Sequence, residues 1–191
     1  MNAVRAFAVA AVLALAGCST TTSPGTSQPP TTSSAPAQTA GFGGTDLAWI
    51  EINIAMDEQL LPLLELVPDR SGSAAVQALA TQVKAFTDAE LSTLRQLRDQ
   101  AGLPAENPHE GMPMPGMVQA DQVAKAAKLV GPEFDAYVVT QIKGYLDQSQ
   151  SLARSEDQSG VEAQTRSLAL QVLRTRTEAL STLKKTQPGS S

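Results

Sequence analysis

The chain has 191 residues, with 14 Lys and Arg against 19 Asp and Glu and a formal net charge of −5. Its acidic balance and its aromatic content of 4% argue against a nucleic-acid partner, which needs a basic surface interleaved with aromatic side chains. Cys18 is the one cysteine, so no disulfide can form within the chain.

Residues 1–17 have the pattern of an export signal. Arg5 supplies positive charge, and an apolar run follows from Ala6 to Ala16. A membrane-spanning helix needs roughly 20 apolar residues. Because this run is shorter, it predicts a cleaved signal peptide.

The end of this signal, Leu15-Ala16-Gly17-Cys18, resembles the lipobox of bacterial lipoproteins. The resemblance implies cleavage before Cys18 and a diacylglyceryl group, with acyl chains such as palmitate, on its thiol. Two or three acyl chains give stable anchoring. The expected location is therefore the cell membrane, with the protein lipid-anchored through Cys18 and facing the extracytoplasmic side. An ordinary secretory signal with a chance cysteine is the alternative.

Residues 18–44 are rich in Ser, Thr, Pro, Gly and Gln. They predict a disordered tether, because they hold too little apolar surface to offset chain entropy. Residues 187–191 predict a similar tail. Residues 45–186 are the right size for one domain. Clusters of Val, Ile and aromatic residues with a period of two are absent from it, which predicts an all-α domain.

Apolar residues with helical spacing predict four long helices. The first begins near Leu47 and contains Pro62, which should kink it near Glu58. A turn at residues 68–73 leads to the second helix, which ends near Gly102. The apolar positions of these two helices are Ile50, Ile54, Leu61, Leu64, Val76, Leu79, Val83, Leu91, Leu94 and Leu97.

The other two long helices follow a linker rich in Pro, Gly and Met at residues 103–118. A short helix is expected at residues 119–129. The third long helix should begin at Pro132, whose ring suits the first position of a helix, and the fourth should follow Gly160. Four amphipathic helices joined in this way predict a four-helix bundle.

The two predicted hairpins, residues 45–102 and 119–186, carry an internal repeat. An offset of 89 residues pairs Leu91-Ser-Thr-Leu94 with Leu180-Ser-Thr-Leu183. Other identities at this offset are Asp46 with Asp135, Gln59 with Gln148, Leu63 with Leu152, Leu79-Ala80 with Leu168-Ala169, and Gln82-Val83 with Gln171-Val172. One offset without a gap indicates a duplicated helical hairpin. Chance identity in an Ala- and Leu-rich chain explains only single matches.

These residues resemble the ferritin-like helical proteins of domain-of-unknown-function family 305. Its members are exported and built from two helical hairpins. Each half opens with Asp or Phe-Asp and carries a His-His pair, then a Met; the second helix of each half carries a Gln and a Glu. The matching residues here are Asp46, Phe134-Asp135, Glu58-Gln59, Gln148 and the His-, Met- and Gly-rich residues 109–117.

Other polar positions of the family are changed in this chain, although Glu90 is kept in the second helix of the first half. The His-His positions hold Met56-Asp57 in the first half and Tyr145-Leu146 in the second. The Met positions hold Leu63 and Leu152. The Gln positions hold Thr87 and Arg176, and the second Glu position holds Ala179. Imidazole and thioether groups are the ligands that suit copper. The resemblance therefore implies that an interior metal site is lost here.

Asp57 and Glu90 fall on the apolar stripes of the first two helices. Buried carboxylates with raised pKa values mark functional sites in some proteins. The alternative, which we favour, is that both lie at the edge of the bundle or pair with Arg176, Arg174 or Lys143.

His109, Met112, Met114 and Met117 form the one cluster of soft metal ligands in the sequence. Cu(I) and Ag(I) bind thioether and imidazole groups, so a metal site in this linker is one interpretation. A flexible connector that binds no metal is the other, and the favoured one.

No Ser-His-Asp set, Gly-rich phosphate loop or free cysteine nucleophile is recognisable, so we expect no enzyme activity. The favoured hypothesis is a membrane-anchored envelope lipoprotein without a cofactor, which binds an unknown envelope protein or small ligand. Copper or silver binding by the Met-rich linker is the second hypothesis. A carrier with an apolar pocket at the lost site is the third. A tightly packed interior around Met56 and Tyr145 would favour the first over the third.

Overall fold

The computed structural model describes residues 41–186, so the predicted signal peptide, Cys18, most of the tether and the tail lie outside the described residues. Within this range the chain forms helices and no strands. The helices are α1 (Gly44–Glu65), α2 (Val67–Arg70), α3 (Ala74–Gln100), α4 (Ala120–Ala126), α5 (Gly131–Ser159) and α6 (Ala163–Thr186). No helix in the described part of the chain has the length and apolar character needed to cross a bilayer.

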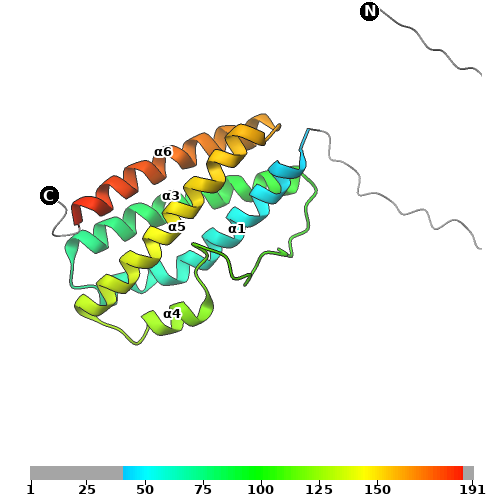
Figure 1. Ribbon diagram of the computed structural model, residues 1–191. Helices are drawn as coiled ribbons and strands as arrows, with labels where there is room; N and C mark the ends of the chain where they lie inside the picture. Colours follow the sequence, from blue (N-terminus) through cyan, green and yellow to red (C-terminus); the bar gives the residue numbers. More distant parts are fainter. Residues whose placement is uncertain (1–40, 187–191) are drawn as a thin grey trace, which may run out of the picture. The chain divides into compact units, whose positions relative to one another are not determined.

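The four long helices form an antiparallel bundle (Figure 1). α1 and α3 make one hairpin, and α5 and α6 make the other. The hairpins pack with α1 against α5 and α3 against α6, whereas the diagonal pairs contact each other much less. The predicted all-α four-helix bundle of two hairpins is confirmed.

The short connections differ in detail from the prediction. The segment at residues 68–73 is not only a turn, because its start belongs to α2, with Pro68 in the first turn of that short helix. Proline favours such a position because its fixed φ suits a helix start. Pro132 occupies the first turn of α5, as expected. α1 continues through Pro62 as a single helix.

Two apolar clusters fill the bundle, one on each side of a polar layer. On α1, Asp57 lies between Ile54 of one cluster and Leu60 of the other. On α6, Arg176 lies likewise between Val172 and Ala179. The layer consists of Asn53, Asp57, Thr87, Glu90, Ser149 and Arg176, all buried.

The linker between the hairpins packs closely on the bundle. The Nδ2 of Asn107 donates a hydrogen bond of 2.7 Å to the carbonyl of Glu51 on α1. Gly116 has a φ of +76°, and a Cβ at this position would lie 2.6 Å from the carbonyl oxygen of Gly144 on α5. Only glycine allows both this backbone conformation and this close approach. The linker is therefore held against α1 and α5.

Asp46 joins the start of α1 to the loop before α6. Its Oδ2 accepts a hydrogen bond of 2.6 Å from the N–H of Gly43. Its Oδ1 accepts from the N–H groups of Val161 at 3.0 Å and Glu162 at 3.1 Å. Burial tends to raise the pKa of Asp46, but these hydrogen bonds and one from Glu156 leave it lowered.

Glu156 is the buried partner of Asp46, and its side chain is fully enclosed. Burial, a hydrogen bond with Asp46 and the charge of Asp46 raise the pKa of Glu156 to about 8. The carboxyl group of Glu156 is therefore mostly protonated at neutral pH, and its O–H donates a hydrogen bond to the carboxylate of Asp46. Gly160 is required beside it, because a Cβ there would lie 2.0 Å from Oε1 of Glu156.

Candidate functional site

The strongest concentration of buried charge lies at the centre of the bundle, where each long helix contributes one residue. Asp57 comes from α1, Glu90 from α3, Tyr145 from α5 and Arg176 from α6. Glu90 is 4% exposed and the other three are 0% exposed. We call these four residues the central cluster.

Arg176 lies within 4 Å of every other residue of the central cluster. Its Nη1 lies 2.8 Å from Oε2 of Glu90, and its Nη2 donates a hydrogen bond of 2.6 Å to the hydroxyl of Tyr145. Its Nε donates to Oγ of Ser149 at 3.0 Å. The guanidinium also lies over the ring of Phe86, 4.4 Å from its centroid, which adds a cation–π contact.

The hydroxyl of Tyr145 connects Arg176 to Asp57. It donates a hydrogen bond of 2.5 Å to Oδ1 of Asp57, while it accepts from Nη2 of Arg176. The direct distance from Nη2 of Arg176 to Oδ1 of Asp57 is 3.9 Å, too long for a hydrogen bond. Tyr145 therefore mediates the interaction of Asp57 with the cation, and Thr87 lies 3.4 Å from the same hydroxyl.

Two acids and one guanidinium would leave a net negative charge in the core if both acids were ionised. Burial and then the charge of Glu90 raise the pKa of Asp57 well above its usual value, although Arg176 opposes this shift. Burial also raises the pKa of Glu90, against the attraction of Arg176. Glu90 has the direct ion pair with Arg176, so the pKa of Asp57 is raised further than that of Glu90.

Of the two alternatives favoured for Asp57 and Glu90, the structure bears out pairing with Arg176. Glu90 pairs with it directly, whereas Asp57 interacts with it through the hydroxyl of Tyr145, with 3.9 Å between Oδ1 and Nη2. Neither lies at the edge of the bundle, because both are buried. Lys143 pairs with Asp147 on its own helix instead. Helical periodicity placed the acids on apolar stripes, but it could not show how deeply these stripes are buried.

The 89-residue repeat shows how the two halves differ at this site. Tyr145 is equivalent to Met56, and Arg176 is equivalent to Thr87. Both acids belong to the first half, whereas the cation and the bridging hydroxyl belong to the second. Met56 and Leu146 are 0% exposed and complete the apolar wall. Sequence reasoning did not identify Phe86 and Ser149 as contacts of Arg176, because neither occupies a family position.

The interior does not suit a metal ion. The guanidinium of Arg176 already supplies the positive charge between the acids, and one thioether, that of Met56, is the only soft group at these positions. Among residues 41–186, no group of three or more His, Cys, Asp or Glu side chains is arranged to hold a metal ion.

The four residues of the Met-rich linker lie in different surroundings. His109 is held near α1, with its Nε2 3.8 Å from Oε2 of Glu51. Met112 is 43% exposed, whereas Met117 is 4% exposed and belongs to the apolar core. Met114 packs against the same core. Copper or silver binding by these residues stays a prediction.

Comparison with known proteins agrees with this architecture. The family model described as "Domain of unknown function (DUF305)" matches residues 46–187. No curated protein matches the chain.

Two solved structures share the fold. A DUF305 protein of Streptomyces coelicolor, inferred to be secreted, has a TM-score of 0.65 and 17% identity, over 74% of this chain and 90% of that one. A DUF305 fragment of Deinococcus radiodurans has a TM-score of 0.67 and 15% identity, over 76% of this chain and 96% of that one. With the family model spanning the whole bundle, the chain belongs to the DUF305 family.

Proposed function

We propose that this protein is a lipid-anchored lipoprotein of the bacterial cell envelope with a non-enzymatic binding or interaction role. The observation that carries the proposal is the position of Arg176, which is fully buried and paired with Glu90 at the centre of the bundle. Because the guanidinium of Arg176 fills the position between the buried acids, a partner would bind on the outer surface of the bundle.

The packing of the interior supports an interaction role over a carrier role. Met56, Tyr145 and Leu146 have no exposed surface, so no space the size of a water molecule adjoins these side chains. An apolar ligand of useful size needs a cavity of roughly 300 Å³ or more. A ligand could enter this interior only if the helices separated.

The expected location rests on the N-terminal sequence. Leu15-Ala16-Gly17-Cys18 resembles a lipobox. The family member from Streptomyces coelicolor is inferred to be secreted. An extracytoplasmic location fits both, and lipid on Cys18 would keep the protein at the membrane.

Membrane fractionation tests the anchoring. Cys18→Ala should move the protein from the membrane fraction to the soluble extracytoplasmic fraction, and Ser19→Ala should leave it in the membrane. Mass spectrometry of the retained protein should show an N-terminal Cys18 that carries acyl chains. Membrane retention of the Cys18→Ala variant would contradict the proposal.

Metal analysis tests the statement about the interior. The protein purified from its native membrane should contain no stoichiometric transition metal. An Asp57→Ala variant prepared in parallel should have the same metal content. One metal ion per chain that is lost in Asp57→Ala would show that the central cluster binds metal, and the proposal would fail.

A further inference from the structure

The connection between α5 and α6, residues 160–162, is fastened to the start of α1 by one side chain. The carboxylate of Asp46 accepts hydrogen bonds from the N–H groups of Val161 at 3.0 Å, Glu162 at 3.1 Å and Gly43 at 2.6 Å. The described residues show no hydrogen bond between these two segments that does not involve Asp46. The hold of α1 on this connection therefore depends on the acceptor groups of Asp46.

Glu156, in the last turn of α5, lies beneath the same connection. Asp46 and Glu156 are both 0% exposed, and their carboxyl groups are joined by a hydrogen bond. A Cβ on Gly160 would overlap the carboxyl group of Glu156, so the backbone of the connection covers this group directly. Water can reach Glu156 only if the connection moves away from it.

No cationic side chain among residues 41–186 pairs with either acid. The charges that act on Glu156 are those of Asp46 on α1, Glu162 in the connection and Arg166 on α6. Arg166 is engaged by Asp157, with 3.8 Å between Nη2 and Oδ1, and Glu162 is bonded within the first turn of α6. Two carboxyl groups that share a buried site cannot both be ionised at low cost.

The closed arrangement therefore holds one proton between the two acids. Asp46 accepts three backbone hydrogen bonds, which stabilise its ionised form, so the proton belongs to Glu156. The lowered pKa of Asp46 and the raised pKa of Glu156 agree with this assignment.

We propose that Asp46 and Glu156 form a proton-operated latch between α1 and the connection before α6. While Glu156 holds its proton, its O–H donates to Asp46 and the connection stays closed. When Glu156 loses the proton, the two buried carboxylates repel each other. The connection then lifts away from α1, water reaches both acids, and the N–H groups of Val161 and Glu162 lose their acceptor.

The opening is local, because little apolar surface holds the connection in place. Val161 is 67% exposed, and none of residues 160–162 belongs to either apolar cluster. Trp49 and Leu168, the nearest buried members of the cluster on this side, lie within α1 and α6. Segments with few buried apolar contacts open without unfolding of the whole domain.

The internal repeat supplies an equivalent connection that has no latch. At the offset of 89 residues, Asp46 corresponds to Asp135, Glu156 to Val67, and Val161-Glu162 to Gly72-Ser73. Oδ1 of Asp135 has no hydrogen-bond partner in the described part of the chain, and Val67 belongs to the apolar core. The connection before α3 therefore lacks the second acid and serves as a reference within the same molecule.

Amide hydrogen exchange, measured by NMR on the complete chain in detergent, tests the latch. The protection factor is the ratio of the intrinsic to the measured exchange rate, so it already corrects for base catalysis. Opening releases one proton, because the pKa of Glu156 falls from about 8 towards the reference value of 4.5. Between about pH 6 and pH 8, the protection factors of Val161 and Glu162 should therefore fall by up to about tenfold per pH unit.

Two other amides separate local opening from unfolding of the bundle. The protection factor of Ser73, in the reference connection, should change much less with pH. Ile142, buried at the centre of α5, should exchange far more slowly than Val161 at every pH. Equal protection of Val161 and Ile142 would show that the connection opens only with the whole bundle. That result, or a protection factor of Val161 that does not depend on pH, would overturn the proposal.

Variants identify the titrating group. In Glu156→Gln the amide can still donate to Asp46 but does not titrate, so the protection of Val161 should no longer depend on pH. Ser159→Ala, at an exposed position beside the connection, should keep the dependence of the unmodified chain. An unchanged pH dependence in Glu156→Gln would assign the proton to another group and refute the latch.

Gly160→Ala opens the latch by a different route. The φ of Gly160 is −68°, which any residue adopts, so the added Cβ acts only through its overlap with Glu156. Displacement of Glu156 should lower the protection of Val161 even at pH 6. Full protection of Val161 at pH 6 in this variant would show that the connection does not cover the carboxyl group.

The latch goes beyond the proposed function and can fail without it, since neither lipid on Cys18 nor a bound partner enters the argument. The predicted tether, residues 18–44, ends beside Asp46. Alkaline surroundings would therefore loosen the bundle at the point where the tether joins it.

Discussion

Arg176 and Glu90 meet inside the bundle with 2.8 Å between Nη1 and Oε2, and they come from the second helices of the two repeated halves. The first helices supply Asp57 and Tyr145, which are joined by a hydrogen bond of 2.5 Å. The first half thus has the acids and the second half the cation. Neither hairpin can bury its own charges without the other, so the central cluster selects the pairing of the two halves.

Removal of the cation should destabilise the protein strongly. Arg176→Met leaves Glu90 and Asp57 buried without a counter-charge, and breaking a buried pair in this way costs about 3–5 kcal/mol. Urea unfolding measures the loss. Arg95→Met is the matched control, because it removes the exposed ion pair with Glu58 and should cost less than about 1 kcal/mol.

A compensating variant distinguishes lost pairing from lost packing. Arg176→Met combined with Glu90→Gln removes both charges of the direct pair, so it should recover a large part of the stability lost in Arg176→Met. If the double variant is as unstable as the sum of the two single variants, the ion pair is not the source of the effect.

Loss of the bridging hydroxyl should have a smaller effect. Tyr145→Phe removes the bond to Asp57 and the acceptor of Nη2 of Arg176, and each buried polar group left unpaired costs about 1–3 kcal/mol. The free energy of unfolding should fall accordingly. Tyr137→Phe, at a partly exposed tyrosine of the same helix, should leave it nearly unchanged.

Stability should decrease as pH rises because of Glu156. Its folded pKa of about 8 lies above the reference value of 4.5, so the folded state binds more protons than the unfolded state between these values. The free energy of unfolding should therefore fall by up to about 1.4 kcal/mol per pH unit in this window from this group, and level off above it. Asp46 has a lowered pKa, so its opposite contribution lies below pH 3.8.

The free energy of unfolding of a Glu156→Gln variant, measured between about pH 5 and pH 8, tests this contribution. This range lies between the reference pKa of 4.5 and the folded pKa of about 8 for Glu156. The glutamine amide can still donate to Asp46, but it does not titrate. Its stability should depend less on pH, whereas Glu178→Gln, at an exposed position on α6, should keep the dependence of the unmodified chain. Equal slopes for Glu156→Gln and the unmodified chain would show that Glu156 does not titrate in this window.

The Met-rich linker should contribute little to metal binding. Met117 is buried in the apolar core and Met112 is exposed, so a shared ion would require Met117 to leave the core. Calorimetric titration with Cu(I) should give equal and small heats for the chain and for a variant with Met112, Met114 and Met117 changed to Leu. A large heat that disappears in the variant would establish the linker as a copper site.

The helical class, the two hairpins and the repeat can all be predicted from the amino-acid sequence alone. Helical spacing of apolar residues such as Ile50 and Ile54 determines which faces turn inward, and this depends only on the chain's own periodicity. The family positions in the sequence also include all four residues of the central cluster, Asp57, Glu90, Tyr145 and Arg176.

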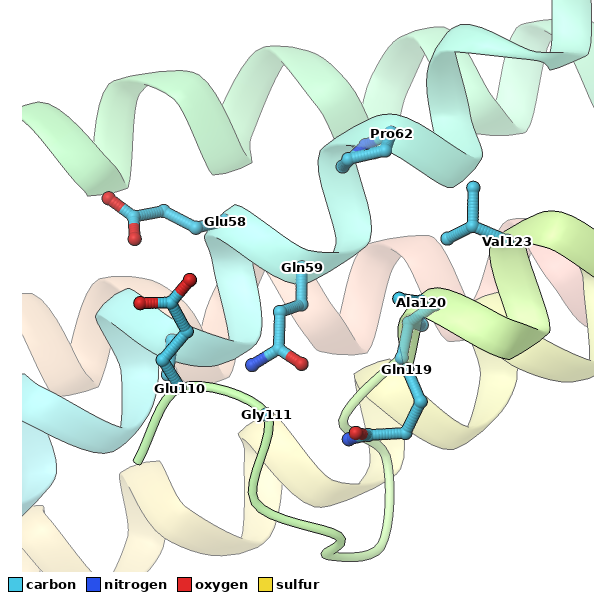
Figure 2. Close-up of a pocket in the computed structure, with 10 residues that line it drawn as sticks. Glu58, Gln59, Pro62, Glu110, Gly111, Gln119, Ala120 and Val123 are labelled. Carbon is cyan, nitrogen blue, oxygen red and sulfur yellow. The ribbon is translucent and has the colours of Figure 1, made fainter. Parts of the chain in front are cut away.

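How these residues interact depends on the packing of the helices and cannot be predicted from the sequence. Arg176 lies 86 residues after Glu90 in the chain, and no local pattern states that α3 packs beside α6. The same holds for the surface pocket that Glu58 of α1 and Glu110 of the linker both line (Figure 2), which forms because the linker folds back onto α1. Charge pairing and pocket formation depend on distances between remote segments, which the packing of the whole bundle sets.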